Sequence, residues 1–206
     1  SVDNDFPQLL RPLPACPAIL WYRGNIQKAT SVGVGIVGAR RCTEYGKQIT
    51  TIFSGQISRK DMTIYSGGAR GIDGIAHRAA IKAGGTNVVV LGSGLRMIYP
   101  PEHSSLFEQV IDDGGVVISE FPCDSPPKPA SFPRRNRIVA GLSSAVLVIE
   151  AANRSGALIT ARIAVEEHGR DVFVIPGRIG DSASAGCLRV LDEGWVRLAL
   201  DPEVVI

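Results

Sequence analysis

The sequence has few of the residues that mark metalloproteins and secreted disulfide proteins. Its 206 residues include four cysteines and three histidines, and no Cys-x-x-Cys pair occurs. Common zinc sites are built on such pairs, so we expect no metal. A chain of this length can bury a sufficient core without disulfides, and we expect no signal peptide. Reduced thiols and a cytoplasmic location are therefore expected.

Long apolar runs and a strong charge of either sign are also missing. No run approaches the roughly 20 residues that span a bilayer, so we expect no membrane role. The formal net charge is only +2, which by itself favours neither nucleic acid nor a membrane surface. The local distribution says more, because residues 125–149 include Lys128 and three arginines but no acidic residue.

Short apolar runs alternate with longer amphipathic stretches from residue 34 onward, which is the pattern of βαβ units. The predicted strands are 34–37, 62–65, 87–91, 116–118, 145–149 and 171–175. The predicted helices are 45–59, 72–83, 104–112, 135–141, 157–168 and 188–193. Both faces of the runs are apolar, which indicates buried parallel strands. The predicted fold is a Rossmann-like, open and mostly parallel α/β sheet with helices on both faces.

The first 30 residues show a different pattern from the rest of the sequence. Four prolines between residues 7 and 17 exclude a long helix, and the apolar residues 18–22 suggest a short edge strand or a packed arm. We expect residues 1–30 to be an extension packed on the core, and residues 31–206 to form the Rossmann-like domain.

One glycine motif invites a misleading interpretation. Gly33-Val-Gly-Ile-Val-Gly38 matches G-x-G-x-x-G, but its first two glycines lie at the start of the apolar run and only Gly38 follows it. A dinucleotide fingerprint follows a strand and opens a helix, so we expect no nicotinamide, flavin or other cofactor. Arg40 and Arg41 come next and could either meet a phosphate or form a solvated pair.

Three further segments carry candidate binding groups, and two of them, 66–73 and 150–160, lie where parallel strands end, the usual ligand side of such a sheet. Ser66-Gly-Gly-Ala-Arg-Gly-Ile-Asp73 joins a strand to a helix, where free amides stabilise an anion, and Asp73 is expected to tie the loop. Phe132-Pro-Arg-Arg-Asn-Arg137 combines an aromatic ring with three guanidinium groups, which suits single-stranded nucleic acid. In the segment 150–160, Ser155 and Gly156 suit a helix N-cap and phosphate approach.

Taken in order along the chain, these segments resemble the DprA/Smf family. The resemblance is carried by Leu20-Trp-Tyr-Arg-Gly-Asn25, Gly35-Ile-Val-Gly-Ala-Arg40, Ser66-Gly-Gly-Ala-Arg-Gly-Ile-Asp73, Gly92-Ser-Gly-Leu95, Ser119-Glu-Phe-Pro122, Phe132-Pro-Arg-Arg-Asn-Arg137, Glu150-Ala151 and Val174-Ile-Pro-Gly177. It implies a non-enzymatic protein that binds single-stranded DNA, protects incoming DNA in natural transformation and helps load the RecA recombinase, usually as a homodimer. Many members carry a helical domain before this core and a winged-helix domain after it, and this sequence resembles the core alone.

By that resemblance Arg40 would be a principal DNA contact. The expected DNA-binding residues are Arg40, Arg41, Gly67, Gly68, Arg70, Phe132, Arg134, Arg135, Asn136 and Arg137. The expected phosphate-binding residues are Gly38, Ser66, Gly71, Ser155 and Gly156, and no catalytic residue is expected.

Two alternatives remain at this point. A phosphoribohydrolase-like enzyme acting on nucleoside monophosphates would use Glu150 and the turn at 155–160, although the Pro-Gly-Gly-x-Gly-Thr loop of such enzymes is absent. A nucleotide-sensing module would bind a small nucleotide without affinity for DNA.

Overall fold

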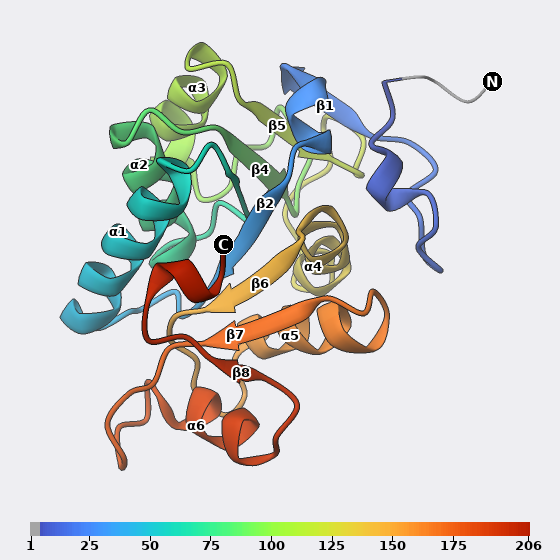
Figure 1. Cartoon of the computed structure of the whole chain (residues 1–206). Coiled ribbons are helices and arrows are strands. Elements are labelled where there is room, and N and C mark those ends of the chain that lie inside the picture. Colours follow the sequence, from blue (N-terminus) through green and yellow to red (C-terminus); the bar gives the residue numbers. More distant parts are fainter. Residues whose placement is uncertain (1–4) are drawn as a thin grey trace.

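The computed structural model of the chain describes residues 5–206 and places their strands in one sheet, in the order β1-β5-β4-β3-β2-β6-β7-β8 (Figure 1). The strands are β1 Trp21–Gly24, β2 Gly33–Val37, β3 Thr63–Ser66, β4 Asn87–Leu91, β5 Val116–Ser119, β6 Ala145–Val148, β7 Asp171–Val174 and β8 Arg197–Leu198. Only β1 runs antiparallel to its neighbour among them. The expected Rossmann-like sheet is confirmed, with β8 as a strand that the sequence pattern did not predict.

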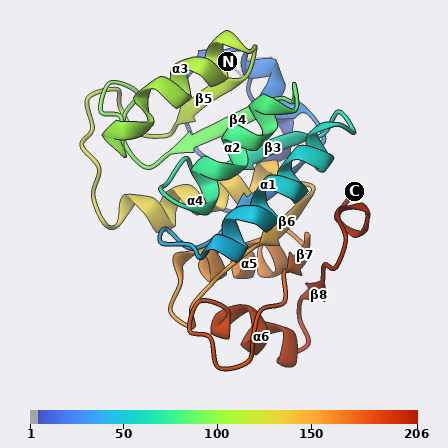
Figure 2. The same cartoon turned by 90° about the vertical axis from the view of Figure 1, so that its left-hand side faces the viewer.

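Six α-helices cover the two faces of the sheet in the described chain (Figures 1 and 2). They are α1 Glu44–Ser58, α2 Ile72–Lys82, α3 Ser104–Asp112, α4 Ser131–Leu142, α5 Gly156–Glu166 and α6 Ala185–Asp192. Helices α1, α2 and α3 pack on one face and α4, α5 and α6 on the other, as the separate core clusters of the two faces show. This division is the doubly wound arrangement expected of alternating strands and helices.

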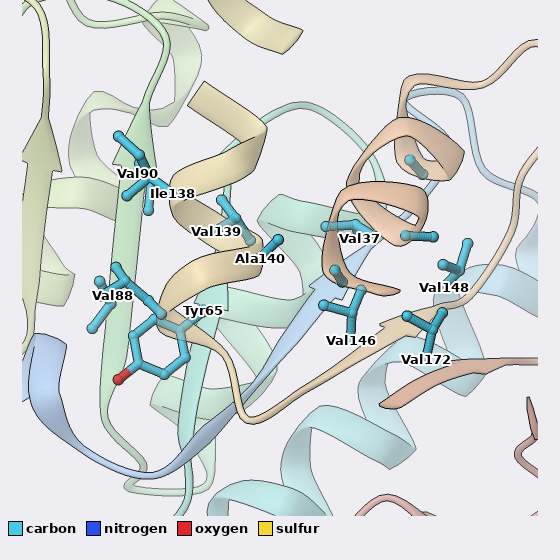
Figure 3. Packing of buried hydrophobic residues seen from close by; sticks show 14 of the residues in the cluster. Val37, Tyr65, Val88, Val90, Ile138, Val139, Ala140, Val146, Val148 and Val172 are labelled. Carbon is cyan, nitrogen blue, oxygen red and sulfur yellow. The ribbon is translucent and has the colours of Figure 1, made fainter. Parts of the chain in front are cut away.

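Alternate residues of each strand supply the two cores. Along β4, Val88 and Val90 join the cluster beneath α4, whereas Val89 and Leu91 join the cluster beneath α3. Figure 3 shows the α4 and α5 side of the sheet, where the valines of four strands and Tyr65 pack against the helices. Because both faces are covered, the strands are apolar on both sides, as the sequence pattern indicated.

Helix α4 begins earlier than the sequence predicted. The prediction began at residue 135, but the helix starts at Ser131 and includes Pro133 in its first turn. A proline is tolerated in the first helical turn, where the backbone N–H groups have no partner within the helix. Phe132 therefore stands on the first turn of α4, rigidly placed relative to the sheet.

The N-terminal segment is joined to the same sheet. Strand β1 pairs with β5 as the edge strand, in the register Trp21 to Ser119, and the fully buried Leu10 packs into the core beneath α4. Residues 1–4 of the expected extension lie outside the described residues. The expected boundary near residue 30 therefore separates two parts of the chain that share one sheet and one core.

The chain changes direction across the sheet between β5 and β6, and β2 and β6 become neighbours. Helix α1 leaves β2 on one face, while α5 leaves β6 on the other. Such a switch point opens a crevice beyond the carboxyl ends of the two strands, and open α/β sheets bind their ligands there.

Candidate nucleic-acid interface

A cleft of about 670 Å³ lies at this switch point. Its walls are the loops that follow β2, β3, β4, β5 and β6, and the first turns of α4 and α5. The expected site residues that line it are Gly38, Arg40, Phe132, Arg135, Asn136, Ser155 and Gly156. The fold thus brings together residues that lie up to 118 positions apart, from Gly38 to Gly156.

An aromatic ring and an exposed cation form one wall of the cleft. The Arg40 guanidinium lies over the Phe132 ring at 4.9 Å from its centroid, and the Tyr99 ring is tilted against Phe132 at 5.6 Å. Gly92, at the end of β4, lets the ring lie close, since a Cβ there would be 2.7 Å from the Phe132 ring. The Phe132 ring offers a planar surface for a base, and the Arg40 guanidinium over it offers a positive charge for a phosphate.

Arg135 is buried beneath this wall. Its guanidinium donates hydrogen bonds to the carbonyl oxygens of Gly67 and Val90 at the ends of β3 and β4, and its Nε donates to Asn136 Oδ1 at 3.2 Å. Burial lowers the pKa of Arg135 to about 10, while the charge of Asp73 opposes that shift. Only 4% of the residue is exposed, so Arg135 holds the strand ends in place and is not free to meet a phosphate.

Arg134 and Arg137 turn to the other side of α4. Both bond to Glu120, whose side chain is 2% exposed, with a distance of 3.1 Å from Arg134 Nε to Glu120 Oε2. Arg134 and Arg137 are three residues apart and share one face of α4, whereas Phe132 and Arg135 share a different face. The sequence showed no acid near this segment, but Glu120, which follows β5, supplies one carboxylate to two of its arginines and leaves part of the positive charge unpaired.

The N-terminus of α5 forms the opposite wall. Ser155 caps the helix by accepting the Ala157 N–H at 3.3 Å, as expected from the sequence. Asn136 donates from Nδ2 to the Gly156 carbonyl oxygen at 3.3 Å, which joins α4 to α5 across the floor of the cleft. The helix dipole gives this wall a positive character that favours an anion.

The loop after β3 is committed to contacts within the protein. Ser66 Oγ donates to the Ile36 carbonyl oxygen at 2.6 Å, and the Asp73 carboxylate accepts the Ala69 N–H at 3.3 Å, which is the expected tie. Gly71 has a φ of +73°, and a Cβ there would be 2.2 Å from the Ala39 carbonyl oxygen. An anion at the start of α2 would therefore compete with groups already in place.

The other glycines of this loop serve packing in the same way. A Cβ on Gly67 would collide with the Arg135 guanidinium, and Gly68 adopts a φ of +64° against Phe107. Arg70 lies outside, bonded bidentately to Glu102, with its guanidinium 5.6 Å from the Tyr99 ring centroid. Gly67 and Arg70 line a small recess beside the main cleft, together with Arg40.

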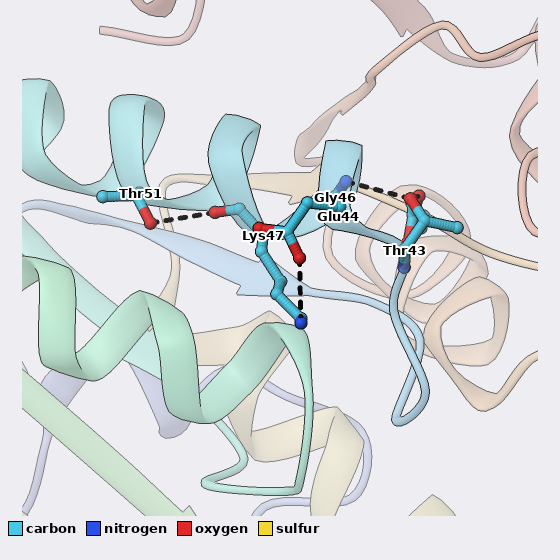
Figure 4. A network of polar contacts seen from close by, with 6 residues as sticks. Thr43, Glu44, Gly46, Lys47 and Thr51 are labelled. Atoms are coloured by element: carbon cyan, nitrogen blue, oxygen red, sulfur yellow. Dashed lines mark hydrogen bonds and ion pairs between the residues drawn. The ribbon is translucent and has the colours of Figure 1, made fainter.

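Helix α1 begins beside the cleft at Thr43, whose hydroxyl accepts the Gly46 N–H at 3.1 Å (Figure 4). The buried Glu150 carboxylate accepts the Thr43 N–H at 2.9 Å and the Thr43 hydroxyl proton. A carboxylate used in this way anchors the loop after β2 to β6. Glu150 is not among the residues that line the cleft, and its carboxylate is bonded to Thr43.

With this geometry established, comparison with known proteins identifies the family. The sequence profile of the DNA recombination-mediator protein A family matches residues 1–206. The chain belongs to this family. Protein Smf of Escherichia coli is 43% identical over 206 residues, which are 99% of this chain and 54% of that protein. The DNA processing protein DprA of Streptococcus pneumoniae is 40% identical and is matched over 67% of its length.

Solved structures agree with the DNA recombination-mediator protein A assignment. The X-ray structure of DNA processing protein A from S. pneumoniae superposes with a TM-score of 0.90 at 38% identity, over 98% of this chain and 70% of that one. The protein from Helicobacter pylori, whose single-stranded DNA binding mode has been described, superposes with a TM-score of 0.87 at 29% identity, over 97% of this chain and 90% of that one. The chain spans about half the length of the E. coli relative.

More distant structures share only the fold. A molybdenum cofactor binding protein from Rippkaea orientalis superposes with a TM-score of 0.58 at 17% identity, over 84% of this chain. The common architecture is the Rossmann-like sheet, and function is decided by the side chains at its carboxyl edge.

Three residues of the interface were not among the expected DNA-binding or phosphate-binding residues. Lys128 lines the cleft and makes no side-chain hydrogen bond or ion pair within residues 5–206. Tyr99 supports Phe132, and Glu120 forms ion pairs with Arg134 and Arg137. The absence of acids around Lys128 could have signalled a role for it, but the other two act through contacts made by the fold.

No group of three or more metal-ligating side chains could hold an ion within residues 5–206 of the chain. Nor does any helix of the described residues combine the length and the apolar character needed to cross a membrane.

Proposed function

We propose that the chain binds single-stranded DNA in the cleft at the carboxyl ends of β2 and β6, without covalent chemistry. The observation that carries the proposal is the Arg40 guanidinium over the Phe132 ring, in a cleft whose opposite wall is a helix N-terminus. The family relationship and the described single-stranded DNA binding of the H. pylori protein support it.

The proposed contacts divide the cleft by chemistry. Arg40 and Lys128 would meet phosphates, Phe132 would stack with a base, and Asn136 and the α5 N-terminus would offer polar groups to the strand. Arg135 would act by positioning the walls rather than by touching DNA. Affinity should fall as salt rises, because each phosphate contact releases condensed counterions.

The test is fluorescence anisotropy with labelled oligo-dT. Arg40→Ala and Phe132→Ala should each weaken binding about ten-fold or more, since a base–aromatic stack contributes about 1–3 kcal/mol. Arg59→Ala is the matched control, because Arg59 is an equally exposed arginine at the end of α1, on the opposite edge of the sheet. Equal affinities for Arg40→Ala and the Arg59 control would refute the proposed site.

The same preparation separates the alternatives. An enzyme acting on nucleoside monophosphates would release free base from AMP, and a nucleotide-sensing module would respond to ATP in thermal unfolding but not to oligonucleotides. We expect neither result.

The finer roles follow from the resemblance stated above. We propose that the bound strand is protected during transformation, that it is passed to the RecA recombinase in the cytoplasm, and that two chains act as a homodimer. Light scattering tests the dimer. A RecA filament-assembly assay on oligo-dT coated with single-strand-binding protein tests the loading role.

A further inference from the structure

The carboxyl edge of the sheet continues past the cleft toward β7, and each loop there carries an exposed arginine. Arg41 follows β2, Arg154 follows β6 and Arg178 follows β7. Within residues 5–206, none of these three side chains makes a hydrogen bond, an ion pair or a ring contact. Three unpaired guanidinium groups on adjacent loops are a strong local positive charge on a nearly neutral chain.

The three loops are held side by side. β2, β6 and β7 are successive parallel neighbours, so their ends lie within about 10 Å. The Thr43 N–H donates to Glu150 at 2.9 Å, which joins the first loop to β6. The Tyr45 hydroxyl donates to the Pro176 carbonyl oxygen at 3.0 Å, which joins the start of α1 to the end of β7.

The acidic groups of these loops are engaged locally. Glu44 pairs with Lys47 along α1 at 3.0 Å, and Asp181 Oδ1 accepts the Ala183 N–H at 2.9 Å. Glu150 is buried behind Thr43. None of the three carboxylates bonds to the arginines, so the positive charge of these loops is available to a ligand.

An aromatic ring lies among these cations. The Tyr45 side chain is 43% exposed, although its hydroxyl is tethered to Pro176, so its ring is both accessible and fixed. Cations that follow a backbone, together with a fixed ring on which a base can stack, are the combination that holds single strands.

We propose that a single strand leaves the cleft along Arg41, Arg154 and Arg178, with Tyr45 as a second stacking platform. This set of four residues is here called the β7 track. It is continuous with the cleft, since Arg41 follows Arg40 and Arg154 precedes Ser155 in the chain. The inference rests on the proposed function and adds the direction in which the bound polyanion extends.

The test compares oligo-dT of about 4 and about 16 nucleotides, the two ends of the range of site sizes known for single-strand-binding domains. The double variant Arg154→Ala with Arg178→Ala should weaken binding of the longer probe about ten-fold. Its salt dependence should also become shallower by about 1.4, since each lost phosphate contact removes about 0.7 from the slope for single strands. The short probe should bind as it does to the unaltered chain.

The matched control is Arg23→Ala with Arg96→Ala, which removes the same charge from two arginines that pair with Glu108 and Asp124. The β7 track is overturned if the Arg154 and Arg178 double variant binds the longer probe with the same affinity and the same salt slope as this control. Weak binding of both probes to the unaltered chain would instead overturn the proposed function itself.

Tyr45 provides an independent readout. Tyr45→Phe keeps the ring and should retain most of the affinity for the longer probe, whereas Tyr45→Ala should lose about five-fold or more. Equal affinities for the two Tyr45 variants would contradict stacking there. Thermal unfolding and elution volume, measured on every variant, show whether fold and oligomeric state are retained.

Discussion

The two halves of the sheet's carboxyl edge carry similar numbers of arginines but use them differently. On the β3, β4 and β5 half, Arg70, Arg96 and Arg134 each pair with a carboxylate. On the β2, β6 and β7 half, Arg41, Arg154 and Arg178 have no such partner within residues 5–206. A basic residue therefore leaves its charge available to a ligand only where the fold supplies no acid to meet it.

Arg40 lies at the junction of the two halves. Within residues 5–206 its guanidinium makes no ion pair and lies over the Phe132 ring instead, an interaction that costs little to exchange for a phosphate. Arg135 is buried and holds the ends of β3 and β4 through the Gly67 and Val90 carbonyl oxygens. The three arginines of α4 are therefore engaged within the protein, whereas Arg40 is exposed.

The largest expected effect tests whether Arg135 belongs to the structural side of this comparison. Arg135→Met should lower the free energy of unfolding by about 3–5 kcal/mol, because it leaves the buried Asp73 without its opposing charge. Urea denaturation measures this change. Adding Asp73→Asn should restore part of the loss, while Arg134→Ala, at an exposed side chain, should cost much less. A stable Arg135→Met chain with weakened DNA binding would move Arg135 to the binding side.

A second prediction defines the pH range in which binding can be compared. His77 is fully buried beside Asn87, and burial lowers its pKa to about 4. The unfolded chain takes up this proton near pH 6.5, so stability is retained above that pH and falls as the pH drops toward 4, by about 3 kcal/mol from this group. Urea denaturation between pH 7.5 and pH 4 should show a shallower decline for His77→Gln. Parallel declines would show that His77 is not protected from protonation.

The smallest expected effect converts a paired cation into a free one. Glu102→Gln releases Arg70, which already lies 5.6 Å from the centroid of the Tyr99 ring beside the cleft. Oligo-dT binding at low salt should tighten by about two- to five-fold, and thermal stability should change little, because the pair is half-exposed. Asp124→Asn, which frees Arg96, is the matched variant farther from the cleft. Unchanged binding by Glu102→Gln would show that Arg70 does not reach the strand.

Much of the fold was predictable from the sequence. The strand at 87–91 coincides with β4, and the other buried strands agree within one residue at each end, because β-branched apolar runs between turn residues favour buried strands. The literal G-x-G-x-x-G match was correctly assigned to a strand, since Gly33 and Gly35 lie inside β2. The start of α4 was predicted too late. The sequence does not show whether Pro133 lies in the first turn of a helix or in the loop before it.

The candidate site divides in the same way. The sequence by itself determined which segments reach the carboxyl edge, because the order of strands and helices follows from local hydrophobic patterns. Only the tertiary structure decided which arginines are free. Glu120 approaches Arg134 from 14 positions away, Glu102 approaches Arg70 from 32, and the Gly67 carbonyl oxygen approaches Arg135 from 68. Charge pairing depends on distance in space, and residues so far apart in sequence are brought within a few ångströms only by the packing of the sheet.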